Sequence, residues 1–223
     1  MPLSSLPDLP EDKTWNFAYV GRDTSSGELQ IDLQKRSFIG IKDIWHPSLV
    51  DCLKLRRVRQ LTATTYEAAY WSAGTASSLE PRTVIAKVAR FEWEIPRLSM
   101  ETSIYKILQN TGLAPEFVGH VHEHGRIIGF LLTKLEGREA SIEDLPLCQS
   151  VLKRLHDVGI LHGDANKYNF IVHGDTVHLI DFESSKLCDV ASASMHAELE
   201  SLREQLREGT RRGAGFIPLH RLN

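Results

Sequence analysis

The chain has 223 residues, of which 42% are hydrophobic and 25% are charged, and its formal net charge is −3. These values are typical of a globular protein with one large domain or two closely packed lobes, and they argue against a generally polyanion-binding surface. Cys52, Cys148 and Cys188 lack CxxC spacing, so they predict a reducing compartment and neither a disulfide framework nor a zinc site.

Residues 1–13 combine prolines with polar side chains, which predicts a flexible arm. The arm has neither the basic nor the apolar region of a secretory signal, and no run in the chain reaches the roughly 18 apolar residues of a membrane span. We therefore expect a cytoplasmic protein. Runs rich in β-formers follow at Trp15–Val20, Leu29–Leu33 and Phe38–Ile41, and they predict a small β-meander.

Leu53–Thr62, LKLRRVRQLT, is predicted to be a strand with a cluster of cations. This cluster is either a solvated strand face or a contact for phosphate groups, such as those of RNA. The next stretch, Thr62–Gly74, reads TATTYEAAYWSAG and contains no G-x-G-x-x-G, although its threonines offer hydroxyl groups. Gly74–Pro81 is predicted to be a turn.

Arg82–Arg90, RTVIAKVAR, predicts a strand in which Lys87 lies on the face opposite Val84 and Ala86. A lysine on a central strand needs a counter-charge, because burying it alone is costly. The alternative is an edge-strand lysine whose ammonium group reaches solvent.

A helix is predicted at Met100–Asn110 with Ser99 as its cap, because Pro96 disfavours helical backbone at the residue before it. Glu101, Ile104, Tyr105 and Leu108 fall on one face of this helix. Glu101 is therefore the expected partner of Lys87, unless it is only a first-turn glutamate favoured by the helix dipole. Glu92 and Glu94 are the other candidates.

Two further strands are predicted at Pro115–His122 and Arg126–Thr133, around the turn Glu123-His124-Gly125. The alternating histidines at 120, 122 and 124 are interpreted as solvent-facing, because residues two apart on a strand rarely converge on one metal ion. A helix is predicted from Ser141–Glu143 through Leu145–Val158, and Gly159 ends it.

Leu161–Ser185 reads LHGDANKYNFIVHGDTVHLIDFESS, a polar loop followed by a predicted hairpin of Phe170–Val172 and Val177–Ile180. An antiparallel hairpin brings its outer ends together, so Asn169 and Asp181 are expected to lie side by side near Asp164. Such a group of oxygen donors suits Mg²⁺, which usually shares its ligands with phosphate groups.

HGDANKYN and IDFE together resemble the kinase catalytic loop H-R-D-x-x-x-x-N and the D-F-G that follows it. The HGD form is similar to small atypical kinases: the kinase of the tRNA threonylcarbamoyl-modification complex, lipopolysaccharide kinases, aminoglycoside phosphotransferases and short fungal kinase-like proteins. The resemblance implies ATP and Mg²⁺ as cofactors, Asp164 as the residue that receives the acceptor proton, and Asn169 and Asp181 as metal ligands. Glu183 stands where the motif has glycine. One interpretation is that its carboxylate is an additional metal ligand or a contact to the acceptor.

The same resemblance assigns roles to residues earlier in the chain. VIAK matches the strand whose lysine pairs the nucleotide phosphates, so Lys87 and Glu101 form the expected nucleotide-positioning pair. The segment LLTKLEG matches the hinge, where the backbone of Thr133 and Leu135 is expected to bind the adenine edge.

The last predicted element is a helix at Ser192–Arg207, with an apolar stripe that packs on the protein, ahead of a tail at 211–223. The fold class implied is α+β, a two-lobed protein-kinase-like fold with a β-rich N-lobe and a truncated helical C-lobe. The predicted divisions are an arm at 1–13, an N-lobe with its β-meander extension at 14–135, and a C-lobe at 136–223.

The expected function is ATP-dependent phosphoryl transfer. The acceptor is expected to be a small molecule or a restricted macromolecular target, because the long helical subdomain on which kinases dock peptides is missing. The missing glycines keep two alternatives open, a pseudokinase-type binding module and a kinase scaffold for another reaction, such as nucleotidyl or RNA-dependent transfer.

Overall fold

The computed structural model describes residues 8–12, 14–71, 81–190 and 192–208. Its contacts divide the chain into two compact units, Met1–Ile39 and Gly40–Asn223. The finer predicted boundary between two lobes, after Leu135, stays a prediction. The arm at 1–13, the turn at Gly74–Pro81 and the tail at 211–223 lie largely or wholly outside the described residues.

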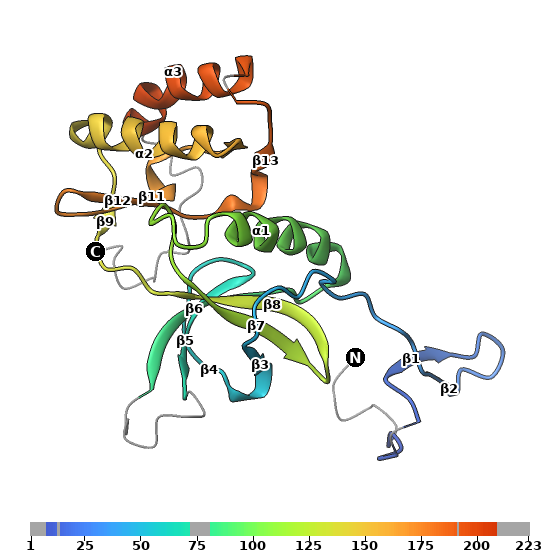
Figure 1. Cartoon of the computed structure of the whole chain (residues 1–223). Helices are drawn as coiled ribbons and strands as arrows, with labels where there is room; N and C mark the ends of the chain where they lie inside the picture. Colours follow the sequence, from blue (N-terminus) through green and yellow to red (C-terminus); the bar gives the residue numbers. More distant parts are fainter. Residues whose placement is uncertain (1–7, 13, 72–80, 191, 209–223) are drawn as a thin grey trace, which may run out of the picture. The chain divides into compact units, whose positions relative to one another are not determined.

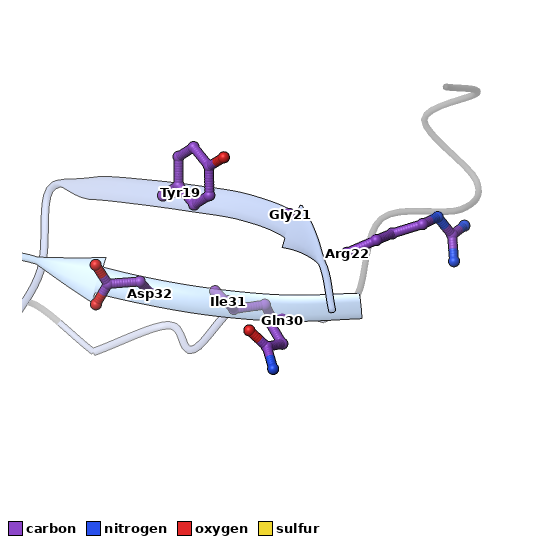
Figure 2. A pocket seen from close by; sticks show the side chains of 6 residues that line it. All are labelled: Tyr19, Gly21, Arg22, Gln30, Ile31 and Asp32. Atoms are coloured by element: carbon purple, nitrogen blue, oxygen red, sulfur yellow. The ribbon is translucent and has the colours of Figure 1, made fainter. Parts of the chain in front are cut away.

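The first unit is an antiparallel hairpin of β1 (Phe17–Arg22) and β2 (Leu29–Gln34). Its turn is closed by Asp23, whose Oδ1 accepts the backbone N–H groups of Ser25 and Ser26 at 2.9 and 2.8 Å. The predicted third strand of a meander, at Phe38–Ile41, is wrong, because this stretch forms no ladder with the hairpin. Figure 2 shows a shallow pocket made by the hairpin alone, with Tyr19, Gly21, Arg22, Gln30, Ile31 and Asp32 lining it.

The second unit contains a six-stranded sheet in the order β3-β7-β8-β6-β5-β4 (Figure 1). Only the β3–β7 pair is parallel. Its strands are β3 (Leu49–Asp51), β4 (Arg56–Gln60), β5 (Thr65–Tyr70), β6 (Arg82–Val88), β7 (Phe117–Glu123) and β8 (Arg126–Thr133). The predicted strand at Leu53–Thr62 is shorter than expected, because Cys52–Lys54 forms a 3₁₀ turn.

Helix α1 spans Ile95–Ile107 and begins five residues earlier than predicted. Pro96 lies in its first turn, where a missing N–H group costs no hydrogen bond. Ser99 is therefore inside the helix and not its cap, and its carbonyl accepts the hydroxyl of Ser103 at 3.0 Å. The predicted apolar face is confirmed, because Glu101, Ile104, Tyr105 and Leu108 are at most 4% exposed.

The remaining elements form the helical part, in which α2 (Leu145–Asp157) packs against α3 (Ala193–Arg207) (Figure 1). The predicted hairpin is confirmed as β11 (Phe170–His173) and β12 (Thr176–Leu179), and β9 (Arg138–Glu139) pairs with β11. A short ladder joins β10 (Ile160–Leu161) to β13 (Lys186–Leu187). No helix in the described ranges is long and apolar enough to cross a membrane.

One apolar core connects α1, the sheet and the helical part. Tyr105 of α1 makes an edge-to-face contact with Phe182 at 5.2 Å between ring centroids, and it also packs on Phe130 of β8 at 5.6 Å. Phe170 belongs to the same buried cluster. Because Phe182 directly follows Asp181, this packing sets the position of the Asp181 backbone against α1.

His120 differs from its predicted place in solvent, because its side chain is fully buried. Its ring packs on Phe117 and Trp45, and its Nε2 accepts the backbone N–H of His46 at 3.4 Å. Burial lowers the pKa of His120 to about 4, so the ring is neutral at pH 7. Among the described residues, no group of three His, Cys, Asp or Glu side chains is arranged to hold a metal ion.

Candidate nucleotide and phosphoryl-transfer site

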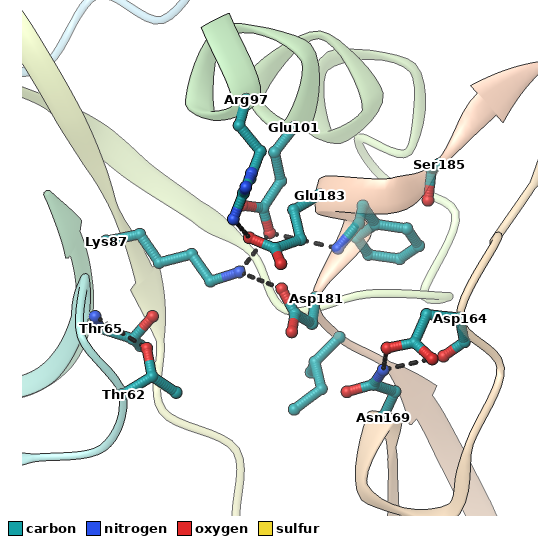
Figure 3. A network of polar contacts seen from close by, with 12 residues as sticks. Thr62, Thr65, Lys87, Arg97, Glu101, Asp164, Asn169, Asp181, Glu183 and Ser185 are labelled. Atoms are coloured by element: carbon teal, nitrogen blue, oxygen red, sulfur yellow. Dashed lines mark hydrogen bonds and ion pairs between the residues drawn. The ribbon is translucent and has the colours of Figure 1, made fainter. Parts of the chain in front are cut away.

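Lys87 reaches the centre of the site from β6, one of the inner strands of the sheet (Figure 3). Its Nζ donates to Glu101 Oε1 at 2.7 Å and to Asp181 Oδ1 at 2.6 Å. Burial alone would lower the pKa of Lys87, but the two carboxylates outweigh it and raise the pKa above its ordinary value. The ammonium group is therefore charged and bridges two carboxylates that are 80 residues apart in the sequence, on α1 and after β12.

Glu101 is the α1 residue that pairs with Lys87, and its side chain has no exposed surface. Its Oε1 also accepts the backbone N–H of Phe182 at 3.2 Å, whereas its Oε2 has no partner among the described residues. Burial raises the pKa of Glu101 to about 7, although Lys87 acts in the opposite direction. The other two candidates for this position are excluded from it, because Glu94 binds the backbone N–H groups of Arg90 and Phe91, and Glu92 lies in the preceding 3₁₀ turn.

Asp181 has a left-handed backbone, with φ 65° and ψ 65°. A residue other than glycine in this region is strained, and such strain is often found at functional sites. Burial would raise the pKa of Asp181, but Lys87 outweighs it and holds that pKa below its ordinary value. The side chain is 34% exposed, so the carboxylate that pairs with Lys87 also faces solvent.

Asp164 and Asn169 come from the loop before β11. Asn169 Nδ2 donates to the Asp164 carbonyl at 2.8 Å and to its carboxylate at 3.3 Å, which directs the amide oxygen of Asn169 away from Asp164 (Figure 3). The Asn169 carbonyl accepts the N–H of Ile180 at 3.0 Å, so the loop is joined directly to the residue before Asp181. The structure thus brings Asp164, Asn169 and Asp181 to the same end of the hairpin.

Glu198 of α3 is a part of this arrangement that the sequence interpretation missed. One of its carboxylate oxygens accepts the N–H of Gly163 at 2.6 Å, and the other contacts the N–H of His162 at 3.2 Å and Nε2 of His156 at 2.7 Å. Glu198 follows Met195 by three residues and therefore lies on the apolar face of the predicted helix. A charged residue on that face is the feature of the sequence that could have identified it.

His162 supports the loop from its buried side. Its Nε2 lies 3.1 Å from the carbonyl of Ile180, and its backbone carbonyl accepts the hydroxyl of Ser185 at 2.8 Å. Burial lowers the pKa of His162. These contacts join the loop that carries Asp164 to the residues on both sides of Asp181.

Comparison with known families gives one result that bears on this site. Residues 123–198 match the family model of the RIO domain. The RIO domain is an atypical protein-kinase-like family, so the match, together with the mixed α+β fold, supports a relation to the kinase-like superfamily and, coarsely, to kinase-like phosphotransferases. The match covers about a third of the chain, and a comparison with curated proteins finds no match.

The RIO-matching segment contains Asp164, Asn169, Asp181 and Glu198, whereas Lys87 and Glu101 lie before it. It also contains the predicted hinge. The backbone N–H of Thr133 donates a hydrogen bond to the carbonyl of Glu116 at 2.9 Å. The backbone group of Thr133 that is left for a nucleotide is therefore its carbonyl. Leu135 is half-buried in a mostly exposed link to the helical part.

The stretch Thr62–Gly74, which lacks G-x-G-x-x-G, begins in a tight turn between β4 and β5. The N–H groups of Leu61 and Thr62 both donate to the carbonyl of Thr65, at 2.9 and 3.0 Å. Thr65 pairs with Lys87 in the sheet, which places this turn beside the lysine (Figure 3). The turn contains no glycine, and the Thr62 hydroxyl accepts the N–H of Thr65 at 3.2 Å within it.

The donor set fits a magnesium-bound nucleotide. Asp181 and Asn169 supply carboxylate and amide oxygens, which are the ligands that Mg²⁺ prefers, and Mg²⁺ commonly takes only one or two protein carboxylates together with phosphate oxygens. The described residues contain no group of three side chains arranged to hold a metal without such additional ligands. Lys87 and the side chains around it thus match a site in which metal and phosphate are bound together.

Proposed function

We propose that the protein is an ATP- and Mg²⁺-dependent phosphotransferase that acts on a small molecule or on a restricted macromolecular acceptor. The observation that carries this proposal is the bridging of Glu101 and Asp181 by Lys87, beside the Asp164–Asn169 pair. A fixed cation and oxygen donors in one place are what phosphoryl transfer requires, since its catalysis consists of positioning and charge stabilisation.

Each residue has a separate role in this proposal. Lys87 holds the nucleotide phosphates, and Glu101 fixes the direction of Lys87. Asp181 and Asn169 hold the metal ion. Asp164, which is exposed, accepts the proton of the acceptor hydroxyl. When bound, ATP supplies the phosphoryl group and Mg²⁺ neutralises its charge.

The acceptor class follows from the chain around Asp164. Only residues 182–192 separate Asp181 from α3, and they include a 3₁₀ turn and the two residues of β13. So short a segment offers little backbone for holding an extended peptide. A compact acceptor is therefore favoured, and we propose a cytoplasmic location because the three cysteines are free thiols.

RNA as the acceptor has weaker support. The cations of β4 already have partners within the protein, because Arg57 lies over the ring of Tyr66 at 4.4 Å and Arg59 pairs with Glu67 at 2.5 Å. Such internal partners make β4 less available to phosphate groups.

A nucleotide-binding module without transfer activity is the second candidate. The turn at Leu61–Thr64 favours it, because no glycine backbone is present there to approach phosphate groups closely. The same scaffold with a different reaction, such as nucleotidyl transfer, is distinguished by the mass added to the acceptor.

Calorimetric titration with ATP and Mg²⁺ tests the proposal directly. We expect the wild type to bind the nucleotide and Asp181→Ala to lose at least about tenfold in affinity, because loss of even an outer-shell partner of a metal ligand typically costs about 10–100-fold in metal affinity. Asp175→Ala is the matched control, since Asp175 is exposed at the opposite end of the same hairpin. Absence of binding by the wild type would refute the proposal, and binding without release or transfer of phosphate would favour the binding module.

A further inference from the structure

The segment Gly40–Ser48, here called the strap, precedes β3 and lies against both the sheet and α1. It is fastened near both ends: the N–H of Ile41 donates to the carbonyl of Ile127 at 2.9 Å, and the N–H of His120 donates to the carbonyl of Ser48 at 2.9 Å. A Cβ atom at Gly40 would come within 2.8 Å of the Ile127 carbonyl, so the backbones approach closely only because glycine is present.

The strap contacts α1 beside Glu101. Trp45 Nε1 donates to the carbonyl and the hydroxyl of Thr102, at 3.1 and 3.2 Å, and the Thr102 side chain is fully buried. One turn further along, Asp43 pairs with Lys106 at 3.1 Å. Trp45 is in turn held by its ring contact with Phe117, at 4.3 Å between centroids. The sheet, the strap and α1 are therefore connected through one indole ring.

The position of α1 decides how Lys87 is paired. Among the residues that the structure describes, the Glu101 carboxylate has partners at Oε1 and none at Oε2, whereas Lys87 has Asp181 as a second carboxylate at 2.6 Å. A small outward movement of α1 would therefore leave Lys87 paired with Asp181 alone. A contact at Thr102, next to Glu101 in the helix, is well placed to oppose that movement.

We propose that the strap is a built-in brace that holds α1 in place and keeps the Lys87–Glu101 pair closed, with Trp45 as its positioning residue. The brace regulates the geometry of the site described above, and its importance for catalysis rests on the proposed function. It gives residues 40–48 a role that their sequence does not reveal.

Chemical labelling of Lys87 by an acylating reagent, measured by mass spectrometry without nucleotide, tests the brace. Lys87 should react slowly in the wild type, because it is charged, buried and paired twice. Trp45→Phe keeps an aromatic ring but removes the indole donor, so we expect labelling to be roughly five- to tenfold faster, as loss of hydrogen bonding of this size implies. Thr102→Val, which keeps the carbonyl acceptor, should give a smaller increase.

Two controls separate the brace from a general loss of stability. Trp71→Phe makes the same change at a half-exposed tryptophan after β5 and should leave labelling of Lys87 unchanged. Val177→Ala creates a cavity in the β11–β12 hairpin and supplies a destabilised reference. If Trp45→Phe labels Lys87 no faster than Val177→Ala at equal global stability, the brace is overturned. This outcome is independent of ATP binding by the wild type, so failure of the brace and failure of the proposed function are distinguishable.

Discussion

The two halves of the site are built in different ways. In the half formed by β6 and α1, Lys87 and Glu101 are 10% and 0% exposed in their side chains and are joined by an ion pair. In the half formed by the loop before β11, Asp164 is exposed and is held by hydrogen bonds within the loop and from Asn169. Asp181 is the connection between them, since it pairs with Lys87 and lies one residue from Ile180, which binds Asn169.

This difference predicts that the two halves respond differently to substitution. A buried ion pair is strongly destabilised when one partner is removed, because the other charge is left without compensation. Removal of an exposed carboxylate changes the free energy of unfolding little, so its main effect should be on the rate of the catalysed reaction. Variants in the first half should therefore change folding and nucleotide binding together, and variants of Asp164 should change turnover only.

The largest effect is expected for Asp164→Asn. Loss of a general base typically reduces the rate by about 10²–10⁴-fold, so ATP turnover or transfer should fall by that order. Calorimetry should give a nucleotide affinity within about twofold of wild type, because Asp164 makes no contact with Lys87 or Asp181 in the described residues. Unchanged activity in this variant would instead favour the binding module.

Lys87→Met should have the next largest effect, on stability as well as on nucleotide binding. Removing one partner of a buried pair costs about 3–5 kcal/mol, measurable by urea denaturation. The double variant Lys87→Met/Glu101→Met should recover much of this loss, since it leaves no uncompensated charge on α1. If the double variant is less stable than the single one, the buried pair is not the origin of the loss.

The loss in Lys87→Met should also depend on pH. The pKa of Glu101 is about 7 in the wild type against an ordinary value of 4.5, and removal of Lys87 raises it further. Between these values the folded protein binds more protons than the unfolded chain, so the free energy of unfolding falls as pH rises from about 4.5 to above 7. A variant that is more stable at pH 8 than at pH 5 would contradict this assignment.

Glu198→Gln should have an intermediate effect, confined to the loop half. The carboxylate accepts two backbone N–H groups of the loop, and hydrogen bonds to charged groups are each worth about 1.5–3 kcal/mol. We expect stability to fall by about 2 kcal/mol and amide exchange at His162 and Gly163 to accelerate, with nucleotide affinity unchanged. Glu200→Gln, at an exposed position of α3, is the matched control. Equal exchange in both variants would show that Glu198 does not hold the loop.

The sequence predicted the local parts of this site better than the distant ones. The turn between β11 and β12 is encoded by Gly174 and its neighbours, so the approach of Asn169 to Asp181 followed from the hairpin alone. Glu101 was predicted from the apolar face of its helix. Both depend on patterns within about ten residues, which sequence reasoning captures well.

The errors arose where tertiary contacts decide the outcome. The sequence predicts that the helix starts after Pro96, whereas in the structure Pro96 lies in the first turn, which accepts proline. His120 was assigned to solvent because nothing local shows that Trp45 covers it. Glu198 and the strap were missed for the same reason, since their partners lie 35 or more residues away in the chain.

The smallest effect is expected at Glu183, which occupies the position of the motif glycine and joins the two halves at the surface. Its carboxylate lies 3.4 Å from Arg97, and the two side chains are 35% and 63% exposed. Exposed pairs of this kind contribute about 0–1 kcal/mol, so Glu183→Gln and Arg97→Gln should each change stability by about 0.5 kcal/mol or less. If Glu183 serves only this ion pair, the Mg²⁺ concentration needed for half-maximal nucleotide binding should stay within about twofold of wild type in both variants, since exposed pairs contribute about 0–1 kcal/mol. A tenfold increase in Glu183→Gln but not in Arg97→Gln would instead make Glu183 a metal ligand, and the metal would then be shared across both halves of the site.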